Sequence, residues 1–349
     1  FLKERTLRED RRYLTPKWPR MAYRRRPEAE RSTCHWGQLK LFEAEMKTLV
    51  EAFASSGDAA SSLHVVYVGA SPGRHMPALI RRMPEMWTWE LYDPRDFHYD
   101  LRSFAEQDAG QNRIKLVNNT FSMETARALA KDFARRRVQC FFISDIRSAE
   151  LSHLDDEDVQ EAVEENMATQ REWVELLRPL ASLLKFRLPW TVGKTEYLKG
   201  KLLVQAFAPC TSTETRLLVS KAHLAEGPVE YDHQTYWEQM MHHNTIGRAR
   251  LHRLEPPLQV DLGAVKGLDS CYDCMSLLLT VRQYLQVFGA KEKSVNDEDI
   301  VAEVNSIVSE ISDQGRTLAT EYFKSVTARD EAVGQQPLRS KRPRMNSSS

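Results

Sequence analysis

The sequence predicts an α/β fold built around a mainly parallel, doubly wound β-sheet. Short β-rich runs alternate with stretches of helical periodicity between residues 63 and 188. One run, residues 138–144, is almost entirely apolar, as expected of a strand that helices cover on both faces. Strands that alternate with helices at this spacing pair in parallel, and 349 residues suffice for one substantial core with extensions at both ends.

The elements are expected in a simple order along the chain. Residues 1–33 are Arg-rich with scattered aromatics and are expected to form an irregular arm, and residues 35–53 have the apolar spacing of a helix. The strands expected in the core are 63–69, 86–92, 113–117, 138–144, 181–188, 201–207 and 215–220. The further helices expected are 74–83, 122–136, 155–177, 236–243, 272–288 and 300–323, and the last dozen residues are expected to be disordered.

Charge is balanced overall but unevenly distributed. The formal net charge is zero, yet residues 1–31 hold 11 Lys or Arg against five Asp or Glu, and residues 337–349 are basic without an acid. This asymmetry suits contact with a polyanion through selected surfaces, although solvated flanks would give the same pattern. Five cysteines are too few for a disulfide framework, and Cys271 and Cys274 are interpreted as packing residues, with zinc as the weaker alternative.

The first candidate site is the Gly69-Ala-Ser-Pro-Gly73 turn, directly after the first predicted strand. Glycines at that place let a ligand approach the backbone closely. The segment matches Gly-x-Ser-x-Gly, the nucleophile elbow of serine hydrolases, in which the residue after the serine donates its backbone N–H to the oxyanion. Here that residue is Pro72, which has no N–H, so a nucleoside-binding turn is preferred over a hydrolase.

Asp93 ends the next predicted strand, 24 positions after Gly69. An acid at that place typically accepts hydrogen bonds from ribose hydroxyls, although it can also simply cap a turn. The turn lacks the lysine that phosphate-binding loops need, which excludes P-loop nucleotidases on pattern. The expected cofactor therefore contains ribose and adenine but no phosphates.

Three charged residues near predicted strand ends form the second candidate site: Asp145, Lys185 and Glu214. Lys185 stands inside an apolar strand run, and a buried lysine needs carboxylate partners, which neighbouring strands can supply. The alternative is that Lys185 extends to solvent at the edge of the sheet and has no chemical role.

Several segments carry a resemblance to a known family. They are 35–41 (HWGQLKL), 65–75 (VVYVGASPGRH), 91–95 (LYDPR), 143–148 (ISDIRS), 179–189 (PLASLLKFRLP), 205–209 (QAFAP) and 214–218 (ETRLL). In these segments the chain resembles the cap-specific mRNA (nucleoside-2'-O-)-methyltransferase family of poxviruses and kinetoplastids, and in particular the kinetoplastid 2'-O-ribose methyltransferases of the spliced-leader cap. The resemblance runs from about residue 35 to residue 284.

The resemblance implies a Rossmann-like S-adenosylmethionine-dependent methyltransferase sheet, mostly parallel with an antiparallel last strand, and helical additions at both ends. We divide the chain into a basic arm (1–33), the methyltransferase core (34–230), a helical part packed on the core (231–330) and a disordered basic tail (331–349). The resemblance also implies a Lys-Asp-Lys-Glu active site of Lys40, Asp145, Lys185 and Glu214. Lys185 is expected to be the general base, with Asp145 and Glu214 positioning it and Lys40 completing the electrostatic field.

The resemblance also suggests binding residues. For S-adenosyl-L-methionine the matching positions are Gln38, Tyr67, Gly69, Gly73, His75, Asp93, Arg95 and Arg147, with Phe121 as a candidate for an adenine contact. The family holds the methylated guanine of the cap between two aromatics, for which Trp190 and Tyr23 are the candidates. Val192 and Trp237 stand where the family has acids, so contact with RNA phosphates through Arg-rich surfaces is the alternative.

The sequence thus predicts an mRNA cap 2'-O-ribose methyltransferase of the cap 4, spliced-leader type that acts on capped RNA. The alternative is a non-catalytic cap- or RNA-binding subunit, against which the retention of all four charged positions argues. No apolar run is long enough to span a bilayer and no signal peptide is visible, so a reducing compartment is expected. The excess of Arg over Lys and the basic stretch 339–344 favour a nuclear kinetoplastid protein.

Overall fold

The computed structural model of the chain describes residues 5–24, 36–56, 62–108, 110–146, 156–209, 211–248, 250–259, 268–289 and 295–312. Within these residues the centre is an eight-stranded sheet with the order β2-β9-β10-β7-β6-β3-β4-β5. The parallel strands are β7 (Ala181–Phe186), β6 (Gln139–Ser144), β3 (Leu63–Val68), β4 (Thr88–Tyr92) and β5 (Ile114–Val117). The antiparallel pairings are made by β10 (Thr215–Ser220), β9 (Lys201–Leu203) and β2 (Tyr13–Leu14).

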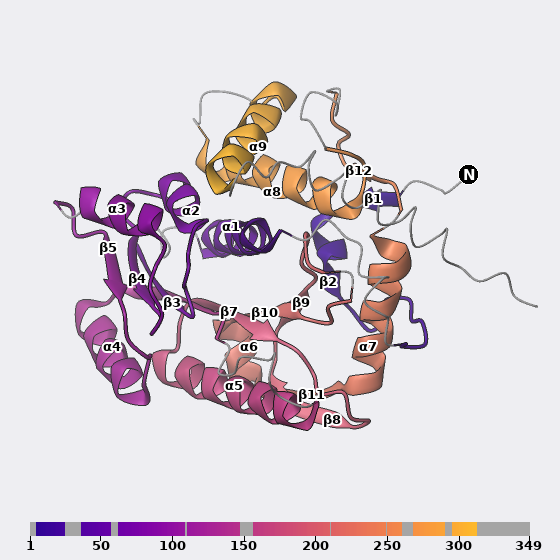
Figure 1. Ribbon diagram of the computed structural model, residues 1–349, viewed down its shortest axis with the longest axis horizontal. Helices are drawn as coiled ribbons and strands as arrows, with labels where there is room; N and C mark the ends of the chain where they lie inside the picture. Colours follow the sequence, from indigo (N-terminus) through magenta and orange to yellow (C-terminus); the bar gives the residue numbers. More distant parts are fainter. Residues whose placement is uncertain are drawn as a thin grey trace, which may run out of the picture.

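This sheet confirms the predicted α/β fold, mostly parallel with antiparallel strands at one side. β3 and β6 are buried along nearly their whole length because helices cover both of their faces (Figure 1). From β3 the chain continues outward to β4 and β5, whereas β6 and β7 lie on the other side of β3. The loops after β3 and β6 therefore diverge at the carboxyl edge of the sheet, which is where open α/β sheets bind ligands.

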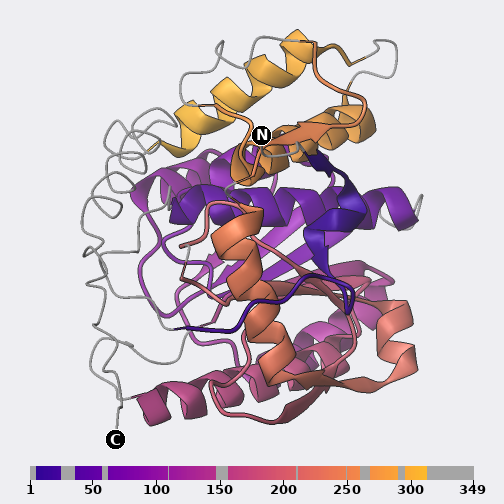
Figure 2. The ribbon, with the colours of Figure 1, turned by 90° about the vertical axis from the view of Figure 1, so that its right-hand side faces the viewer.

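Helices form layers on both faces of the sheet (Figures 1 and 2). One face carries α1 (Gly37–Ser56), α2 (Met76–Arg82) and α3 (Tyr99–Gln107), and the other carries α4 (Met123–Arg136), α5 (Asp156–Leu177) and α6 (Lys221–Glu226). α8 (Tyr272–Phe288) packs on α1, and α9 (Asp297–Ile311) packs on α8 as an outermost layer. α7 (His233–His242) lies at the end of the sheet near β9 and β2.

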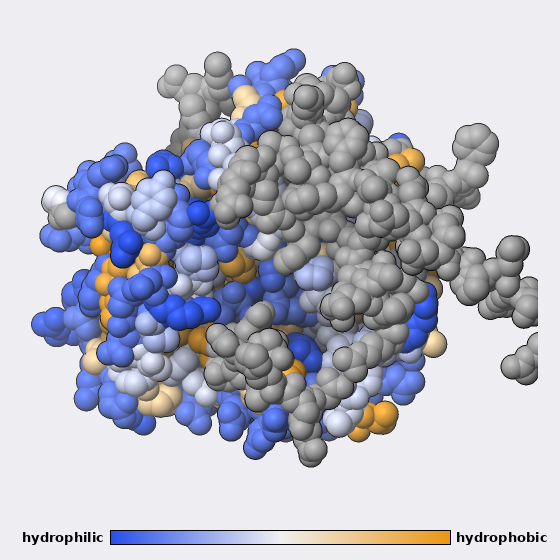
Figure 3. Space-filling model, viewed as in Figure 1, coloured by the Kyte–Doolittle hydropathy of each residue, from blue (hydrophilic) through white to orange (hydrophobic). Residues whose placement is uncertain are grey.

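One face of the molecule can be judged for its polarity. In the view of Figure 3 it is mainly hydrophilic, and hydrophobic residues appear there in small separate groups. Among the described helices, none combines the length and the apolar composition that a bilayer span requires. The apolar residues instead form two cores, one on each face of the central sheet.

The N-terminal segment is not the irregular arm that its composition predicts. β1 (Arg5–Leu7) pairs with β12 (His252–Leu254), and β2 adds an edge strand to the central sheet beside β9. Arg12 is fully buried, where its guanidinium binds Glu43 of α1 and donates to the hydroxyl of Thr280 of α8 over 2.7 Å. A buried cation with a buried carboxylate partner holds the segment against the core. The prediction of an irregular arm was therefore wrong for the residues of β1 and β2.

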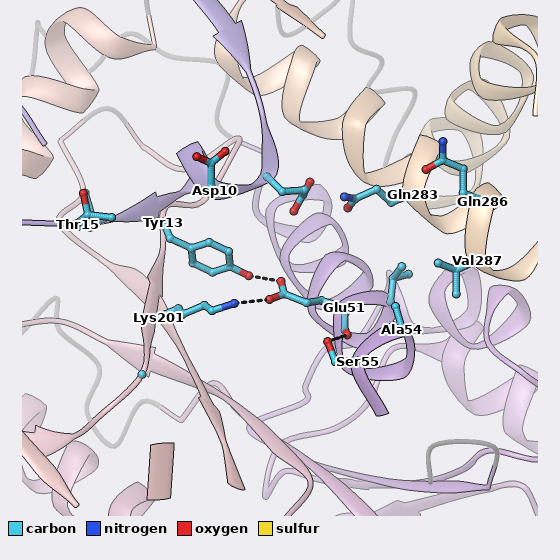
Figure 4. Close-up of a pocket in the computed structure, with 14 residues that line it drawn as sticks. Asp10, Tyr13, Thr15, Glu51, Ala54, Ser55, Lys201, Gln283, Gln286 and Val287 are labelled. Atoms are coloured by element: carbon cyan, nitrogen blue, oxygen red, sulfur yellow. Dashed lines mark hydrogen bonds and ion pairs between the residues drawn. The ribbon is translucent and has the colours of Figure 1, made fainter. Parts of the chain in front are cut away.

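A second polar network fixes the edge strand β2. Figure 4 shows Tyr13 and Lys201 directed at Glu51 of α1, beside a cavity of about 640 Å³. Glu51 accepts a hydrogen bond from Tyr13 and another from Lys201 at 2.8 Å. Lys47 is fully buried and binds both Glu9 at 2.6 Å and Glu51 at 2.8 Å. The network joins α1 to β2 and β9, and thereby holds the N-terminal segment against the sheet.

Several elements depart from the sequence prediction in their extent. The strand predicted at 201–207 ends at Leu203, and the helix predicted at 236–243 starts earlier and continues as a π-helix over His243–Gly247. Two helices, α3 and α6, and a two-stranded sheet of β8 (Lys194–Leu198) and β11 (Pro228–Asp232) were not predicted. The predicted helix at 300–323 corresponds to α9, while its last part and the basic tail lie outside the described residues.

Candidate active site

The four residues of the predicted charged set meet at the carboxyl edge of the sheet. Asp145 follows β6, Lys185 lies in β7 and Glu214 precedes β10. The Nζ of Lys185 lies 3.0 Å from Asp145 Oδ1 and 3.5 Å from Glu214 Oε2. Lys40 comes from the first turn of α1, and its Nζ lies 3.0 Å from Glu214 Oε1. The four side chains are 12% to 18% exposed, so the cluster borders solvent without being open to it.

A fifth charged residue, Arg216, completes the cluster and was missed from the sequence. Its side chain is 2% exposed, and its Nη2 lies 2.9 Å from Asp145 Oδ1 and 3.6 Å from Glu214 Oε1. Gln205 supports the arrangement, because it accepts from Arg216 Nε at 2.9 Å and donates to Glu214 Oε1 at 3.2 Å. The spacing of Arg216 from Glu214 could have indicated it, because side chains two residues apart in an extended chain lie on the same face.

The cations keep the two carboxylates of the cluster ionised. Burial alone raises the pKa of Asp145, but Arg216 and Lys185 outweigh burial and lower this pKa to about 2. Burial also raises the pKa of Glu214, whereas Lys40, Lys185 and Arg216 together hold it well below its ordinary value. Both acids are therefore charged at neutral pH and can accept hydrogen bonds from an amine held between them.

The Gly69–Gly73 turn lies against this cluster. Gly69 has a φ of +82°, and a Cβ at this residue would lie 2.7 Å from the backbone carbon and oxygen of Asp145. Gly73 has a φ of +66°, and a Cβ there would lie 2.6 Å from a methyl carbon of Leu101. Glycine is therefore required at both positions, and the turn offers a ligand bare backbone next to the end of β6.

Asp93 lies at the end of β4, as predicted, and is paired with Arg95. Its Oδ1 accepts from the backbone N–H of Arg95 at 2.9 Å and from Arg95 Nε at 3.0 Å, and its Oδ2 accepts from Arg95 Nη2 at 3.0 Å and from the N–H of Ser71 at 3.0 Å. Burial raises the pKa of Asp93, but these hydrogen bonds lower it below its ordinary value. The Arg95 side chain is 67% exposed, so a ribose can take its place on the carboxylate.

Three of the predicted cofactor residues, Gln38, Tyr67 and His75, are joined through Glu45 of α1. The hydroxyl of Tyr67 donates to Glu45 Oε1 at 2.7 Å, and His75 Nε2 lies 2.8 Å from Glu45 Oε2. His75 Nδ1 lies 3.0 Å from Gln38 Oε1. Tyr67 and His75 are 1% exposed, so both side chains lie inside the protein. Glu45 was missed from the sequence, although it lies two helical turns from Gln38 on the same face of α1.

The two aromatics predicted to hold the cap lie in direct contact. The ring centroids of Tyr23 and Trp190 are 4.6 Å apart, with an interplanar angle of 36°. Trp237 joins them, at 5.4 Å from Trp190 and 6.3 Å from Tyr23. A flat base stacked between two rings needs about 7 Å between them, because each contact spans about 3.5 Å. Tyr23 and Trp190 must therefore separate before a base can enter between them.

Comparison with known proteins places the chain in a family. The family described as "Poly A polymerase regulatory subunit" matches residues 20–253, a span that is more than half of the chain and contains the whole charged cluster. The chain belongs to this family. The match begins in the N-terminal segment, includes all strands of the central sheet except β2, and ends in β12.

The chain is also similar to poxvirus proteins named "Cap-specific mRNA (nucleoside-2'-O-)-methyltransferase". The fowlpox virus (strain NVSL) protein is 30% identical over 188 residues, which are 52% of this chain and 57% of the relative. The proteins of myxoma virus strains Lausanne and Uriarra are 30% identical over 197 residues, which are 55% of this chain and 54% of each relative. The chain thus spans somewhat more than half the length of these relatives.

These relatives confirm the predicted resemblance to the poxvirus cap-specific methyltransferases. They give no support to a kinetoplastid source, which stays a prediction. They also leave the individual roles of the site residues as predictions, because the names describe whole proteins.

Ser71, the nucleophile of the hydrolase alternative, makes a structural hydrogen bond. Its hydroxyl donates to the carbonyl oxygen of Asp96 over 2.8 Å. In the part of the chain that the structure describes, no histidine is hydrogen-bonded to Ser71. Because a serine nucleophile needs a neighbouring base and an oxyanion donor, and Pro72 supplies no N–H, the structure offers no support for a hydrolase.

The structure does not test two further predicted cofactor residues, Phe121 and Arg147. Phe121 is 3% exposed, and its ring meets Tyr92 at 4.8 Å and Trp173 at 5.1 Å, both edge-on, within the core on the α5 face. Arg147 lies outside the described residues. The adenine contact of Phe121 and the cofactor contact of Arg147 stay predictions.

The cysteine pair lies at the start of α8. Cys271 caps this helix, because its Sγ accepts from the backbone N–H of Cys274 at 3.5 Å, and Cys274 is buried. Asp269 brings a third donor atom, and the three lie within 4.8 Å of one another. A structural zinc site has four ligands, so this set, counted over the described residues, is one ligand short.

Proposed function

We propose that this protein is an S-adenosylmethionine-dependent methyltransferase that modifies a ribose 2'-hydroxyl next to the cap of mRNA. The observation that carries the proposal is the amine of Lys185, held 3.0 Å from Asp145 and 3.5 Å from Glu214 at the carboxyl edge of the sheet. A protein that only binds RNA has no need of an amine in this position. The names of the poxvirus relatives, which specify mRNA cap 2'-O-methyltransferases, support the same activity.

Lys185 is proposed to receive the proton of the ribose 2'-hydroxyl. A neutral amine has two N–H groups and one lone pair, so it can donate to Asp145 and to Glu214 and still accept a proton from the hydroxyl. The two carboxylates thereby orient the lone pair of the amine toward the substrate. Arg216 and Lys40 in turn hold the carboxylates, because each lies within hydrogen-bond distance of one of them. Positioning of the hydroxyl oxygen in line with the methyl group supplies much of the rate.

S-adenosyl-L-methionine, when bound, supplies the electrophilic methyl group, and the residues present fit it. The Gly69–Gly73 turn offers backbone without side chains next to Asp145. The carboxylate of Asp93 is bound by Arg95, whose side chain is exposed. Ribose hydroxyls can replace Arg95 as hydrogen-bond donors to this carboxylate. The absence of a lysine from this turn suits a nucleoside cofactor without phosphates.

The cluster of Tyr23, Trp190 and Trp237 is proposed to take the cap. A methylated guanine carries a positive charge, which the faces of aromatic rings attract. Entry of the base requires Tyr23, on the N-terminal segment, to separate from Trp190, on the loop after β7. Trp237 stands where the resembling family has an acid, so we expect the affinity of this protein for the cap to come mainly from stacking.

The finer assignments rest on the sequence. We propose an RNA of the cap 4, spliced-leader type as the substrate and the nucleus as the location. Both follow from the resemblance, the excess of Arg over Lys and the basic stretch 339–344, which lies outside the described residues. Fluorescent fusion of the full chain, with and without residues 337–349, tests the location.

The second candidate is a non-catalytic subunit that binds the cap or RNA within an RNA-processing complex. The description of the family as a regulatory subunit of poly A polymerase favours it. The intact charged cluster favours the enzyme, because binding alone does not need Lys185.

A single assay separates the two candidates. The protein is incubated with S-adenosylmethionine labelled in its methyl group and with capped RNAs that each carry one unmethylated ribose among the first four nucleotides. We expect label in one 2'-O-methyl nucleotide, and no label with Lys185→Ala. Absence of label with wild-type protein that still binds capped RNA would favour the non-catalytic subunit.

A further inference from the structure

A pocket of about 440 Å³ lies between the N-terminal segment, the end of α7 and β12. It is separate from the charged cluster, whose residues do not line it. Its lining in the described residues is Arg5, Thr6, Leu7, Arg11, Thr15, Lys17, Trp18, Pro19, His242, His243, Gly247, His252 and Tyr272. We call it the cationic pocket, because these residues include three Lys or Arg and three His but no Asp or Glu.

The charges of the cationic pocket are not compensated within the described part of the chain. Arg5, Arg11 and Lys17 take part in no ion pair there, and Arg11 donates only to the backbone carbonyl of Thr6, at 3.0 Å. Burial lowers the pKa of Arg5, and the neighbouring cations Arg250 and Arg11 lower it further. Cations therefore lie close enough to repel one another at the pocket, an arrangement that an anion would stabilise.

The described carboxylate that acts on His252, Asp273, is already paired. Asp273 contributes to the electrostatic surroundings of His252, but it forms a bidentate pair with Arg248, at 2.5 Å from Nη2 and 3.1 Å from Nε. It therefore neutralises Arg248 and leaves the lining of the cationic pocket without a counter-charge.

Two buried imidazole nitrogens in the pocket have no hydrogen-bond partner among the described residues. His243 is 3% exposed, and its Nε2 is buried without a hydrogen bond. His252 is 6% exposed; its Nε2 donates to the carbonyl of Gly247 at 3.0 Å, and its Nδ1 is buried without a partner. Buried polar atoms are rarely left unpaired, so both nitrogens call for a ligand. An accepting oxygen pairs with Nε2 of His243, whereas Nδ1 of His252, whose Nε2 carries the proton, pairs with a donor such as a hydroxyl group.

The cationic pocket lies close along the chain to the aromatic cluster that is proposed to bind the cap. Trp18 lines the pocket and lies on the same segment as Tyr23, while His243 directly follows the helix that carries Trp237. Six residues separate Trp237 from His243, which corresponds to about 9 Å along a helix. An RNA strand that leaves the cap can thus reach the pocket within a few nucleotides.

We propose that the cationic pocket binds a phosphate group, and that this phosphate belongs to the backbone of the RNA a few nucleotides beyond the cap. The guanidinium groups of Arg5 and Arg11 and the ammonium group of Lys17 provide the charge. Burial lowers the pKa of His243 and of His252, so both rings are neutral at neutral pH, and His243 donates to the phosphate from Nε2. Trp18 lies beside them, its ring 5.6 Å from that of His243, and offers a surface for a base. The RNA part of the proposal rests on the proposed function, whereas the phosphate site itself does not.

The first experiment uses inorganic phosphate and wild-type protein. Phosphate is added while the imidazole C–H resonances of His243 and His252 are followed by NMR, with chloride at equal ionic strength as the reference. We expect saturable shifts of these two resonances with phosphate and none with chloride. Absence of a saturable shift overturns the phosphate site, whether or not the protein proves to be a methyltransferase.

The second experiment identifies the source of the phosphate. The affinities of Arg5→Gln/Lys17→Gln and of the control Arg102→Gln/Lys131→Gln, which removes two exposed cations elsewhere, are measured for capped RNAs of 2 to 12 nucleotides. We expect the pocket variant to bind the longer RNAs about tenfold more weakly. The slope of log affinity against log salt concentration should become shallower by roughly 0.7, the value for one lost phosphate contact on a single strand. The capped dinucleotide should bind both variants equally. Phosphate shifts without any effect of RNA length would overturn the RNA assignment and leave a free phosphate as the ligand.

Discussion

Lys185 and Arg216 stand directly opposite each other in the antiparallel pairing of β7 with β10. Directly opposite residues share one face of a sheet, and like charges in this arrangement are destabilising by themselves. Asp145 and Glu214 offset the repulsion, since each carboxylate lies within 4 Å of both cations. The two carboxylates that bind the amine of Lys185 are therefore themselves bound by Arg216.

The amine of Lys185 gives the first prediction. Lys185→Ala should lower the rate of methyl transfer by roughly 10² to 10⁴, the range expected for the loss of a general base. Binding of capped RNA, measured by fluorescence anisotropy, should persist. Lys221→Ala, an exposed lysine on α6, is the control. Equal losses of binding and transfer would show that Lys185 has a structural role.

The guanidinium of Arg216 gives the second prediction. Arg216→Met leaves Asp145 and Glu214 buried with less compensation, so the free energy of unfolding should fall by about 3–5 kcal/mol in urea titrations. The double variant Arg216→Met/Asp145→Asn should lose less than the sum of the two single variants, because the residues interact. Strictly additive losses would mean that the contact contributes nothing.

The close approach of Gly69 to Asp145 gives the third prediction. Gly69→Ala places a Cβ 2.7 Å from the backbone of Asp145, and should reduce both cofactor affinity and methyl transfer at least tenfold. Gly227 also has a positive φ, +80° against +82°, but a Cβ there has open space. Gly227→Ala should therefore lose stability through backbone strain and keep its activity. Calorimetric titration with S-adenosylmethionine distinguishes the two variants, and unchanged affinity in Gly69→Ala would refute the assigned cofactor turn.

The aromatic cluster gives the fourth prediction. Trp190→Ala should weaken binding of a methylated cap analogue by about 1–3 kcal/mol, the contribution of one stacked base, and leave uncapped RNA unaffected. Val192→Ala, at a neighbouring residue that is 85% exposed, should change neither affinity. Equal effects of Trp190→Ala on capped and uncapped RNA would place the cap elsewhere.

The network around Glu51 predicts how stability depends on pH. Burial raises the pKa of Glu51, but Lys47 and Lys201 outweigh it and lower the pKa from 4.5 to about 2. The charged form is favoured by folding, so its contribution to stability is complete above pH 4.5 and is lost as the pH falls toward 2. Glu51→Gln should therefore be less stable than wild type at pH 7, and the difference should shrink at pH 3. Urea midpoints at both pH values test this, and a difference that grows in acid would contradict it.

The sequence alone was sufficient for features that depend on neighbouring residues. The apolar run of β6 followed by Asp145, and the run of β3 followed by Gly69, mark strand ends because a few adjacent residues specify them. Parallel pairing follows from the alternation of strands and helices, so the carboxyl edge could be named before the structure. Asp145, Lys185 and Glu214 were recognisable from their places near predicted strand ends, whereas Lys40 came from the family resemblance.

Tertiary structure decided the contacts between segments that lie far apart in the chain. The place of Arg216 beside Asp145 depends on the antiparallel addition of β10, and the place of Arg12 in the core depends on the pairing of β2 with β9. β2 has two residues, too few for any periodicity to predict it. The burial of Arg12 could not be predicted, because a buried cation is recognisable only through its partner, and Glu43 reaches it from another element. Local sequence determines the elements, whereas long-range pairing determines which charges meet.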